Sequence, residues 1–180
     1  LTVTYKLKPR VQFSDGAPFT CADVQFTQTA ILSDLSGAAT AGYGDIARIE
    51  CPDEHTAVVK FNKVYAPYLE LFSYIIPRSA GDIASLDTWP FNQKPTGTGP
   101  WMLQEWQAGE ALTLVKNPKY REAGKPYLDR VTIKIMPSRE TALQQLGAGG
   151  LDMLWDLTET DLPALALLKN QGVASLSTAS

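Results

Sequence analysis

The chain has 180 residues, of which 44% are hydrophobic and 19% charged, and its formal net charge is −3. This composition is typical of a globular domain with a hydrophobic core and excludes disordered, collagen-like and coiled-coil chains. Acidic and basic residues are interspersed without a Lys/Arg stripe, which argues against a nucleic-acid partner, and no apolar run approaches the length of a membrane-spanning helix.

The N-terminal part has the pattern of a strand followed by a capped helix. Residues 1–7 alternate as a strand does, and Ser14-Asp15-Gly16 is a turn signal. Thr20 is followed three residues later by Asp23, which is the spacing of a capping box. We therefore expect a helix from this point, ending near Ser36-Gly37.

A hairpin is expected next. Ala47, Ile49 and Cys51 alternate with polar residues, the segment 52–55 turns the chain, and residues 57–61 return it. This alternation predicts that Cys51 points toward the core.

The remaining elements are separated by an irregular Pro- and Gly-rich segment at 79–100. They are a short helix at 66–72, a hairpin of 101–106 and 112–115, a strand at 131–135, a helix at 138–148, a strand at 152–157, a helix at 159–169 and a strand at 173–178. Antiparallel hairpins followed by a β-α-β ending indicate an α/β or mixed α+β fold with a mixed sheet.

The two cysteines can be read in two ways. Their spacing does not fit a zinc site, which needs two more soft ligands, and the only histidine is His55. In an oxidising compartment Cys21 and Cys51 can form a disulfide that closes a loop of about 30 residues, worth on the order of 3 kcal/mol. Two buried free thiols are the alternative, and the spacing leaves both open.

No catalytic, metal or cofactor site is predicted. His55 lies in a hairpin turn and is better explained as a solvated residue than as part of a Ser/His/Asp triad. Gly97-Thr-Gly99 lacks the third glycine of a dinucleotide fingerprint and the Gly-Lys-Ser/Thr of a phosphate loop. Asp152 and Asp156 lie on one face of the predicted strand, where they cap structure or line a cleft more readily than they catalyse.

The best candidates for contact with a ligand are Trp155, Asp156 and Tyr74. Trp155 lies near the end of a predicted strand, which is where α/β folds place their ligands. The four tryptophans are otherwise explained by burial in the core or in hairpins. We expect these three residues to form one wall of a cleft.

Five segments occur in this order along the chain: VQFSDGAPFTCADV at 11–24, KPTGTGPW at 94–101, NPKY at 117–120, PYLDRV at 126–131 with IKI at 133–135, and LQQLGAGGLD at 143–152. Together they resemble motifs of the family 5 extracellular solute-binding proteins, which include oligopeptide-, dipeptide- and nickel-binding proteins. The chain departs from the family's pattern in three places: Cys21 replaces a small residue, Trp101 replaces Tyr or Phe, and Gly149-Gly-Leu replaces Gly-Glu-Ile.

The resemblance implies a periplasmic-binding-protein-like type II fold, in which two lobes close on a ligand. Residues 1–95 would form the accessory subdomain of the first lobe with its leading strand, 96–150 the return to that lobe, and 151–180 the start of the second lobe near the hinge. The chain, which begins inside a strand pattern, would then be an incomplete piece of a longer protein.

The resemblance also implies the function. The protein would be the substrate-binding component of an ABC importer, in the periplasm or otherwise outside the cytoplasm. It would capture a peptide, a similar small solute or a metal complex and deliver it to the permease subunits. Contact with the membrane would come only through the permease or through a lipid anchor outside this chain. A ligand-presenting sensor is the alternative, and a hydrolase is the least favoured.

The residues of these motifs have structural explanations. Asp15-Gly16 forms a turn that sets the helix, and Thr20 caps it. Gly97 and Gly99 are expected to use backbone conformations closed to other residues, and Pro100 pre-sets the entry to the next strand. None of these residues is expected to bind the ligand directly.

Overall fold

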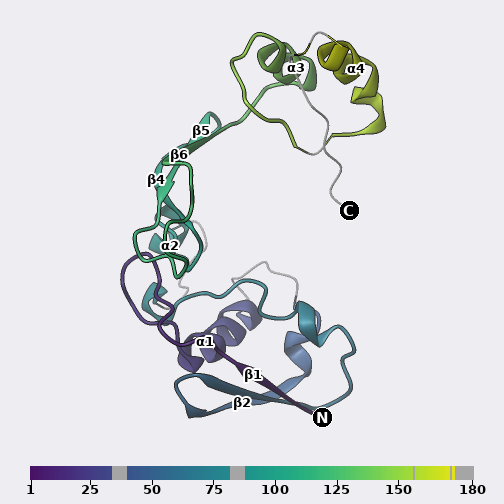
Figure 1. Cartoon of the computed structure of the whole chain (residues 1–180). Coiled ribbons are helices and arrows are strands. Elements are labelled where there is room, and N and C mark those ends of the chain that lie inside the picture. Colours follow the sequence, from purple (N-terminus) through teal and green to yellow (C-terminus); the bar gives the residue numbers. More distant parts are fainter. Residues whose placement is uncertain (34–39, 82–87, 156, 171, 173–180) are drawn as a thin grey trace. The chain divides into compact units, whose positions relative to one another are not determined.

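The structure is a computed structural model that describes all residues except 34–39, 82–87, 156, 171 and 173–180 (Figure 1). The chain forms two compact units. The first comprises Leu1–Gln107 and Leu112–Ile133, and the second comprises Ala108–Ala111 and Lys134–Ser180. No helix in the described ranges is long and apolar enough to cross a bilayer.

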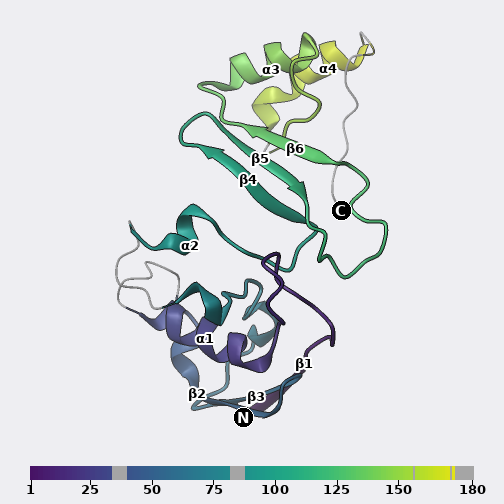
Figure 2. The same ribbon diagram turned by 90° about the vertical axis from the view of Figure 1, so that its left-hand side faces the viewer.

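The first unit begins with an antiparallel sheet of three strands. They are β1 (Thr2–Lys6), β2 (Ile46–Asp53) and β3 (Thr56–Phe61), in the order β1-β3-β2. Helix α1 (Cys21–Leu32) packs on this sheet (Figure 2). The predicted strand, helix and hairpin are therefore confirmed. The core between them contains Cys21, Val24, Tyr43, Ile46, Ile49, Ala57, Val59, Phe61 and Leu71.

Strand β2 differs from the predicted alternation. Ile46 and Ile49 are buried, whereas Ala47 is exposed, because the pairing with β3 shifts register between Ile46 and Arg48. Such an irregularity moves the side chains that follow it to the other face. A spacing of three between the two buried isoleucines follows from it.

Short helical turns fill the connections of the first unit. The helix expected at 66–72 is a single 3-10 turn, η2, and the segment 79–100 contains a four-residue helix, α2. The end predicted for α1 near Ser36-Gly37 lies outside the described residues, and the helix as described ends at Leu32. The turns are η1 (Tyr43–Asp45), η2 (Tyr68–Glu70), η3 (Arg78–Ala80) and α2 (Pro90–Gln93).

A second three-stranded sheet contains the second predicted hairpin. Its strands are β4 (Trp101–Gln107), β5 (Ala111–Lys116) and β6 (Arg130–Lys134), in the order β4-β5-β6 (Figure 2). The N–H of Lys116 donates to the carbonyl of Asp129 (3.4 Å) and that of Ile135 to Glu110 (2.8 Å), so β6 runs antiparallel to β5. The predicted fold class, mixed α/β with antiparallel hairpins, is therefore confirmed, and the described strands form two antiparallel sheets where one mixed sheet was expected.

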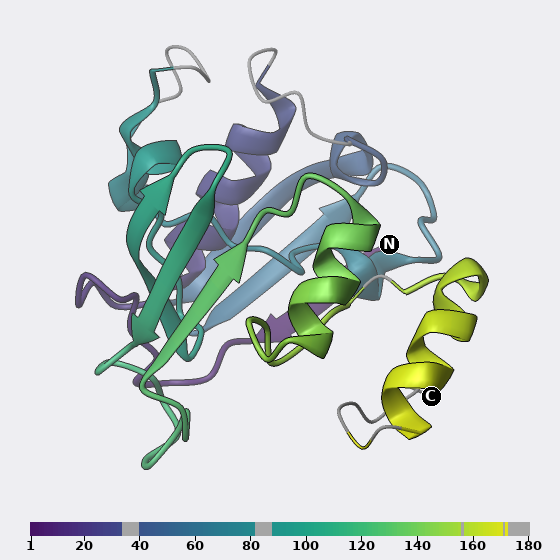
Figure 3. The ribbon, with the colours of Figure 1, turned by 90° about the horizontal axis from the view of Figure 1, so that it is seen from above.

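The second unit contains the predicted helices, α3 (Arg139–Gly147) and α4 (Leu162–Asn170), which contact each other (Figure 3). A 3-10 turn, η4 (Glu159–Asp161), precedes α4. The strand predicted at 152–157 does not form in the described part of that segment. A strand needs a neighbour to satisfy its backbone groups, and no described strand pairs with this segment. The strand predicted at 173–178 lies outside the described residues.

Candidate functional site

Two of the motif segments meet at Asn117, which is 3% exposed. Its Nδ2 donates to the carbonyl of Gly99 (2.7 Å), and its backbone N–H donates to the carbonyl of Pro100 (2.9 Å). Its Oδ1 accepts from the N–H of Lys119 (2.9 Å). The side-chain amide therefore uses both its donor and its acceptor in holding the segment 94–101 against the segment 117–120.

The turn at Asp15-Gly16 joins the same assembly. The N–H of Ser14 donates to the carbonyl of Gly97 (2.9 Å), and Asp15 Oδ1 accepts from the N–H of Ala17 (2.9 Å). Gly16 has a φ of +93°, a conformation that side-chain-bearing residues rarely adopt. Three motifs from distant parts of the sequence thus form one hydrogen-bonded assembly, which we call the motif junction: residues 14–17, 97–100 and 117–119.

Gly97 and Gly99 differ from expectation. Neither has a φ in the left-handed region, and a Cβ added to either would meet nothing within 4 Å. In this structure their carbonyl groups, and not glycine's conformational freedom, connect them to the rest of the junction. Gly42 is the contrasting case, because its φ is +79° and an added Cβ would lie 2.5 Å from the ring of Tyr65.

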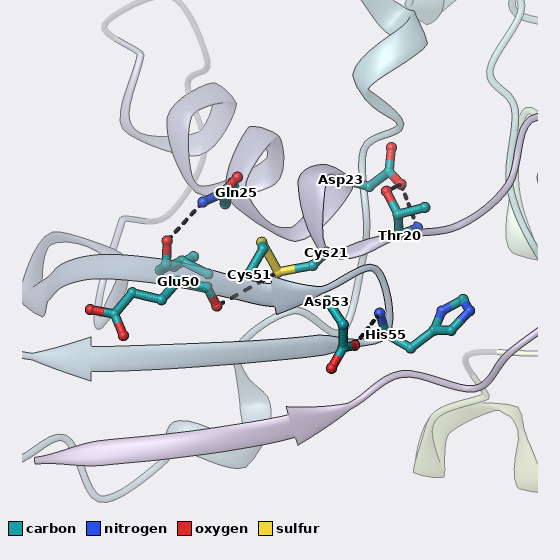
Figure 4. The surroundings of a disulfide bond; sticks show 9 residues. Thr20, Cys21, Asp23, Gln25, Glu50, Cys51, Asp53 and His55 are labelled. Carbon is teal, nitrogen blue, oxygen red and sulfur yellow. Dashed lines mark hydrogen bonds between the residues drawn. A yellow bond between two sulfur atoms is a disulfide. The ribbon is translucent and has the colours of Figure 1, made fainter.

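The start of helix α1 is held by Thr20 and Asp23 (Figure 4). Asp23 Oδ2 accepts from the backbone N–H of Thr20 (2.7 Å) and from its hydroxyl (3.1 Å). The other carboxylate oxygen accepts from the N–H of Arg78 (2.8 Å). The buried carboxylate thus caps the helix and also fixes the distant turn η3.

A disulfide joins Cys21 at the start of α1 to Cys51 on β2, with a Cα–Cα distance of 5.7 Å (Figure 4). The alternative of two free thiols therefore does not apply to this structure. Cys21 is 1% exposed, as a core residue is. Cys51 is exposed and does not point into the core as predicted, because it lies in a second register shift of β2, between Glu50 and Asp53.

His55 is half-buried in the turn between β2 and β3, and is not the fully solvated residue that was expected. Its Nδ1 is buried and has no hydrogen-bond partner in the described structure. Its backbone N–H donates to Asp53 Oδ1 (2.8 Å), and this bond is the main reason why the pKa of Asp53 lies below its usual value. The described residues contain no cluster of three or more His, Cys, Asp or Glu side chains that could hold a metal ion.

The first unit also contains an apolar pocket of about 280 Å³. Phe72 has a φ of +60°, which is rare for a bulky residue, and its N–H donates to the hydroxyl of Tyr43 (2.7 Å). The hydroxyl of Tyr5 donates to the carbonyl of Tyr68 (2.7 Å), and burial raises the pKa of Tyr5. Because the Tyr5 hydroxyl is engaged in this hydrogen bond, the pocket offers mainly apolar surface. It is lined by Tyr5, Leu7, Phe19, Val24, Leu69, Leu71, Phe72, Ser73 and Ile75.

The structure describes two of the three predicted ligand residues, and these two belong to different units. Tyr74 belongs to the first unit, is 86% exposed and does not line the apolar pocket. Trp155 belongs to the second unit and is 54% exposed, and its carbonyl accepts from Arg139 Nη1 (3.5 Å). Asp156 lies outside the described residues. The side chains of Tyr74 and Trp155 are thus accessible to a ligand. That they contact a ligand stays a prediction.

Asp161 connects the turn η4 to the start of helix α3, and the sequence analysis missed it. It is 5% exposed and accepts from the backbone N–H of Thr158 (2.7 Å) and its hydroxyl (3.0 Å). Arg139 Nε lies 3.6 Å from its Oδ1. The hydrogen bond from the Thr158 N–H, more than the nearby Arg139, lowers the pKa of Asp161. The spacing of Thr158 and Asp161 repeats that of Thr20 and Asp23, so the capping signal was present.

A profile of the family described as bacterial extracellular solute-binding proteins, family 5 middle, matches residues 1–180. The probable D,D-dipeptide-binding periplasmic protein DdpA of Escherichia coli K12 is 34% identical over 168 residues, covering 90% of this chain and 32% of that protein. The oligopeptide-binding protein AppA of Bacillus subtilis, solved with a nonapeptide, superimposes with a TM-score of 0.79 at 30% identity, covering 91% of this chain and 34% of AppA.

A similar match is found with NikZ of Campylobacter jejuni, solved in complex with Ni(L-His). Its TM-score is 0.80 at 26% identity, covering 94% of this chain and 34% of NikZ. The chain thus spans about a third of the length of these relatives.

Proposed function

Because the chain belongs to the bacterial extracellular solute-binding proteins of family 5, we propose that the whole protein is the substrate-binding component of an ABC importer. It would capture a peptide, a similar small solute or a metal complex outside the cytoplasm and deliver it to the permease subunits. Capture would occur by closure of two lobes around the ligand. The family is one of binding proteins and not of enzymes.

The observation that carries this proposal is the family match over the whole of residues 1–180, together with the structural likeness to AppA. The names of the relatives support the ligand class. They describe a D,D-dipeptide, an oligopeptide and a nickel–histidine complex. These ligands share amino and carboxylate groups on a small amino-acid-derived body, so this chemistry is the first to test.

We propose further that Tyr74, Trp155 and Asp156 form one wall of the ligand cleft. Tyr74 and Trp155 present large exposed rings, and an exposed aromatic face is a common means of binding an uncharged part of a ligand. In this proposal residues 1–95 form the accessory subdomain, 96–150 return to the first lobe, and 151–180 begin the second lobe.

The test is a ligand panel on the full-length protein, followed by thermal unfolding. The panel contains a D,D-dipeptide, L-peptides of two to nine residues, and nickel with and without histidine. A ligand at 100 times its Kd stabilises the folded state by about 2.7 kcal/mol, which raises the midpoint by several degrees. If no member raises the midpoint, capture of peptides or metal complexes is ruled out as the function.

Delivery to a permease needs a second measurement. Uptake of the ligand found in the panel is measured in membrane vesicles that contain the permease, with and without the full-length protein. Uptake that depends on the protein supports the importer. If the protein binds the ligand but uptake does not depend on the protein, the ligand-presenting sensor is favoured.

A further inference from the structure

The two ends of the Cys21–Cys51 disulfide differ in their surroundings. Cys21 is 1% exposed and belongs to the core, whereas Cys51 is exposed on β2. Of the two residues, Cys51 is therefore the one that a nucleophile in solvent can approach. Exchange at a disulfide depends on which sulfur is accessible and on how well the other sulfur leaves.

A hollow of about 360 Å³ lies beside this disulfide. Two acidic residues line it, Asp53 and Glu54, and no Lys or Arg is among its described lining residues. The backbone N–H of His55 lowers the pKa of Asp53, so this side chain is a carboxylate at neutral pH, and the positive charge of Lys6, which donates to Thr56 Oγ1 (2.8 Å), acts on it in the same direction. The hollow is lined by Thr20, Cys21, Ala22, Gln25, Cys51, Asp53 and Glu54.

We propose that this disulfide is a covalent exchange site for small cationic thiols, with Cys51 as the sulfur that is attacked. The exposed side of Cys51 admits the thiol, and the acidic lining attracts a positive group on it. The hollow is large enough for a molecule of a few non-hydrogen atoms.

The exchange balances without a further oxidant or reductant. The thiolate attacks Sγ of Cys51, a new S–S bond forms between them, and the Cys21–Cys51 bond breaks with its electron pair on Sγ of Cys21. The incoming sulfur is oxidised and Cys21 is reduced, and Cys21 takes up a proton from water. Attack by the Cys21 thiolate on the mixed disulfide reverses the step and releases the thiol.

The position of Cys21 favours its departure. It is the first residue of a 12-residue helix, and the N-terminus of a helix stabilises a thiolate. Sγ of Cys21 lies 3.9 Å from the carbonyl oxygen of Glu50, which can accept a hydrogen bond from the thiol once it is protonated (Figure 4).

Helix α1 keeps other attachments to the sheet when the bond opens. Gln25 Nε2 donates to the carbonyl of Ile49 (2.7 Å), and the N–H of Cys21 donates to the carbonyl of Glu54 (2.8 Å). The exchange can therefore take place in the folded protein and be reversed.

The experiment compares three thiols of similar size and different charge on the oxidised full-length protein. They are cysteamine, 2-mercaptoethanol and 2-mercaptoethanesulfonate. Each rate is divided by the rate of the same thiol with a small uncharged disulfide, which removes differences in pKa and nucleophilicity. After acid quenching and alkylation under denaturing conditions, mass spectrometry locates the adduct.

We expect the adduct on Cys51 and the alkyl group on Cys21. At low ionic strength the corrected rate for cysteamine should be about tenfold higher than that for the sulfonate. In 1 M salt the ratio of these two rates should approach one. An adduct on Cys21, or a disulfide that reacts only after unfolding in guanidinium chloride, would overturn the proposed site. Equal corrected rates for the three thiols would overturn the preference for cations.

Variants that keep both cysteines test the charges. Asp53→Asn and Glu54→Gln should each reduce the preference for cysteamine by about two- to threefold, because each removes one acidic group from the hollow. Glu70→Gln is the matched control, since Glu70 is exposed in the same unit and does not line the hollow. If the control changes the preference as much as the other two, the charges of the hollow do not set it.

Discussion

Asn117 shows how one buried side chain can connect motifs that are distant in the sequence. Its amide spans the carbonyl of Gly99 and the N–H of Lys119, and its own N–H reaches Pro100. Backbone groups at the ends of loops are costly to leave unpaired in a buried place. The Asn117 side chain has one donor group and one acceptor group, so it can pair a backbone group of each segment.

We expect Asn117→Ala to lower the free energy of unfolding by about 1–3 kcal/mol, because it removes the hydrogen bonds of this buried side chain to the backbone of Gly99 and of Lys119. Asn117→Asp keeps the acceptor for Lys119 but places a second oxygen against the carbonyl of Gly99, so it should also destabilise. Urea denaturation measures both. Asn62→Ala, at an exposed asparagine, should change stability by less than about 0.5 kcal/mol. If the Asn117→Ala protein is as stable as that control, Asn117 does not stabilise the fold through the motif junction.

Gly42 and Gly99 test whether a glycine matters because of its backbone conformation or because it belongs to a motif. Gly42→Ala should destabilise by about 2–4 kcal/mol, since it adds left-handed strain and a contact of 2.5 Å with Tyr65. Gly99→Ala should lie within about 0.5 kcal/mol of the wild type, since the added methyl group meets nothing within 4 Å. The same denaturation curves measure both. A larger loss for Gly99→Ala would show that this motif glycine is needed for contacts beyond the described residues.

Among single residues, contacts between neighbours in the sequence could be predicted, whereas contacts between distant residues could not. The Thr20–Asp23 cap is a relation across three residues, so the sequence alone predicts it. The bond of Asn117 to Gly99 spans 18 positions and depends on the folded path of the chain. For the same reason the half-burial of His55 could not be predicted from the polar residues beside it.

At the scale of elements, periodicity predicted most strands and helices, because side-chain patterning needs no knowledge of partners. The register shifts of β2 were not predictable, since they depend on pairing with β3. The segment 152–157 has an apolar pattern typical of a strand, yet a strand forms only beside another strand. Elements that depend on a partner are therefore where a reading of the sequence alone failed.

The turn η4 and helix α3 make the second unit sensitive to acid. Asp161 has a lowered pKa in the folded state, chiefly because of the Thr158 N–H. Its contribution to stability is therefore fully present above the pKa of an unfolded Asp, about 4, and is lost as the pH falls through the lower folded value. We expect Asp161→Asn to be less stable than the wild type at pH 7 and the difference to narrow below about pH 4.

Denaturation of the full-length protein, followed by the exchange protection of amides in α3 and α4 from pH 7 to pH 2, measures this effect. Glu159→Gln is the control, because Glu159 is an exposed carboxylate in the same turn. A stability difference between wild type and Asp161→Asn that stays constant over this range would contradict the assignment to the ionised carboxylate.

At the scale of the whole molecule, the described residues form two units, each with its own stabilising contacts. The first depends on the α1–sheet core, the disulfide and the motif junction, and the second on the α3–α4 contact and on Asp161. Of the residues proposed to contact the ligand, Tyr74 belongs to the first unit and Trp155 to the second.

The proposed ligand contacts make a prediction about affinity in the full-length protein. Trp155→Ala should raise the Kd of the ligand found in the panel by about 5- to 30-fold, since loss of an aromatic contact in a binding site costs about 1–2 kcal/mol. Tyr74→Ala should act in the same direction, and calorimetric titration measures both. Trp106→Ala, at a tryptophan of β4 that is also exposed, is the control and should leave the Kd unchanged. If Trp155→Ala and Tyr74→Ala bind as tightly as that control, neither residue belongs to the cleft. If only one of the two variants weakens binding, only that residue belongs to the cleft.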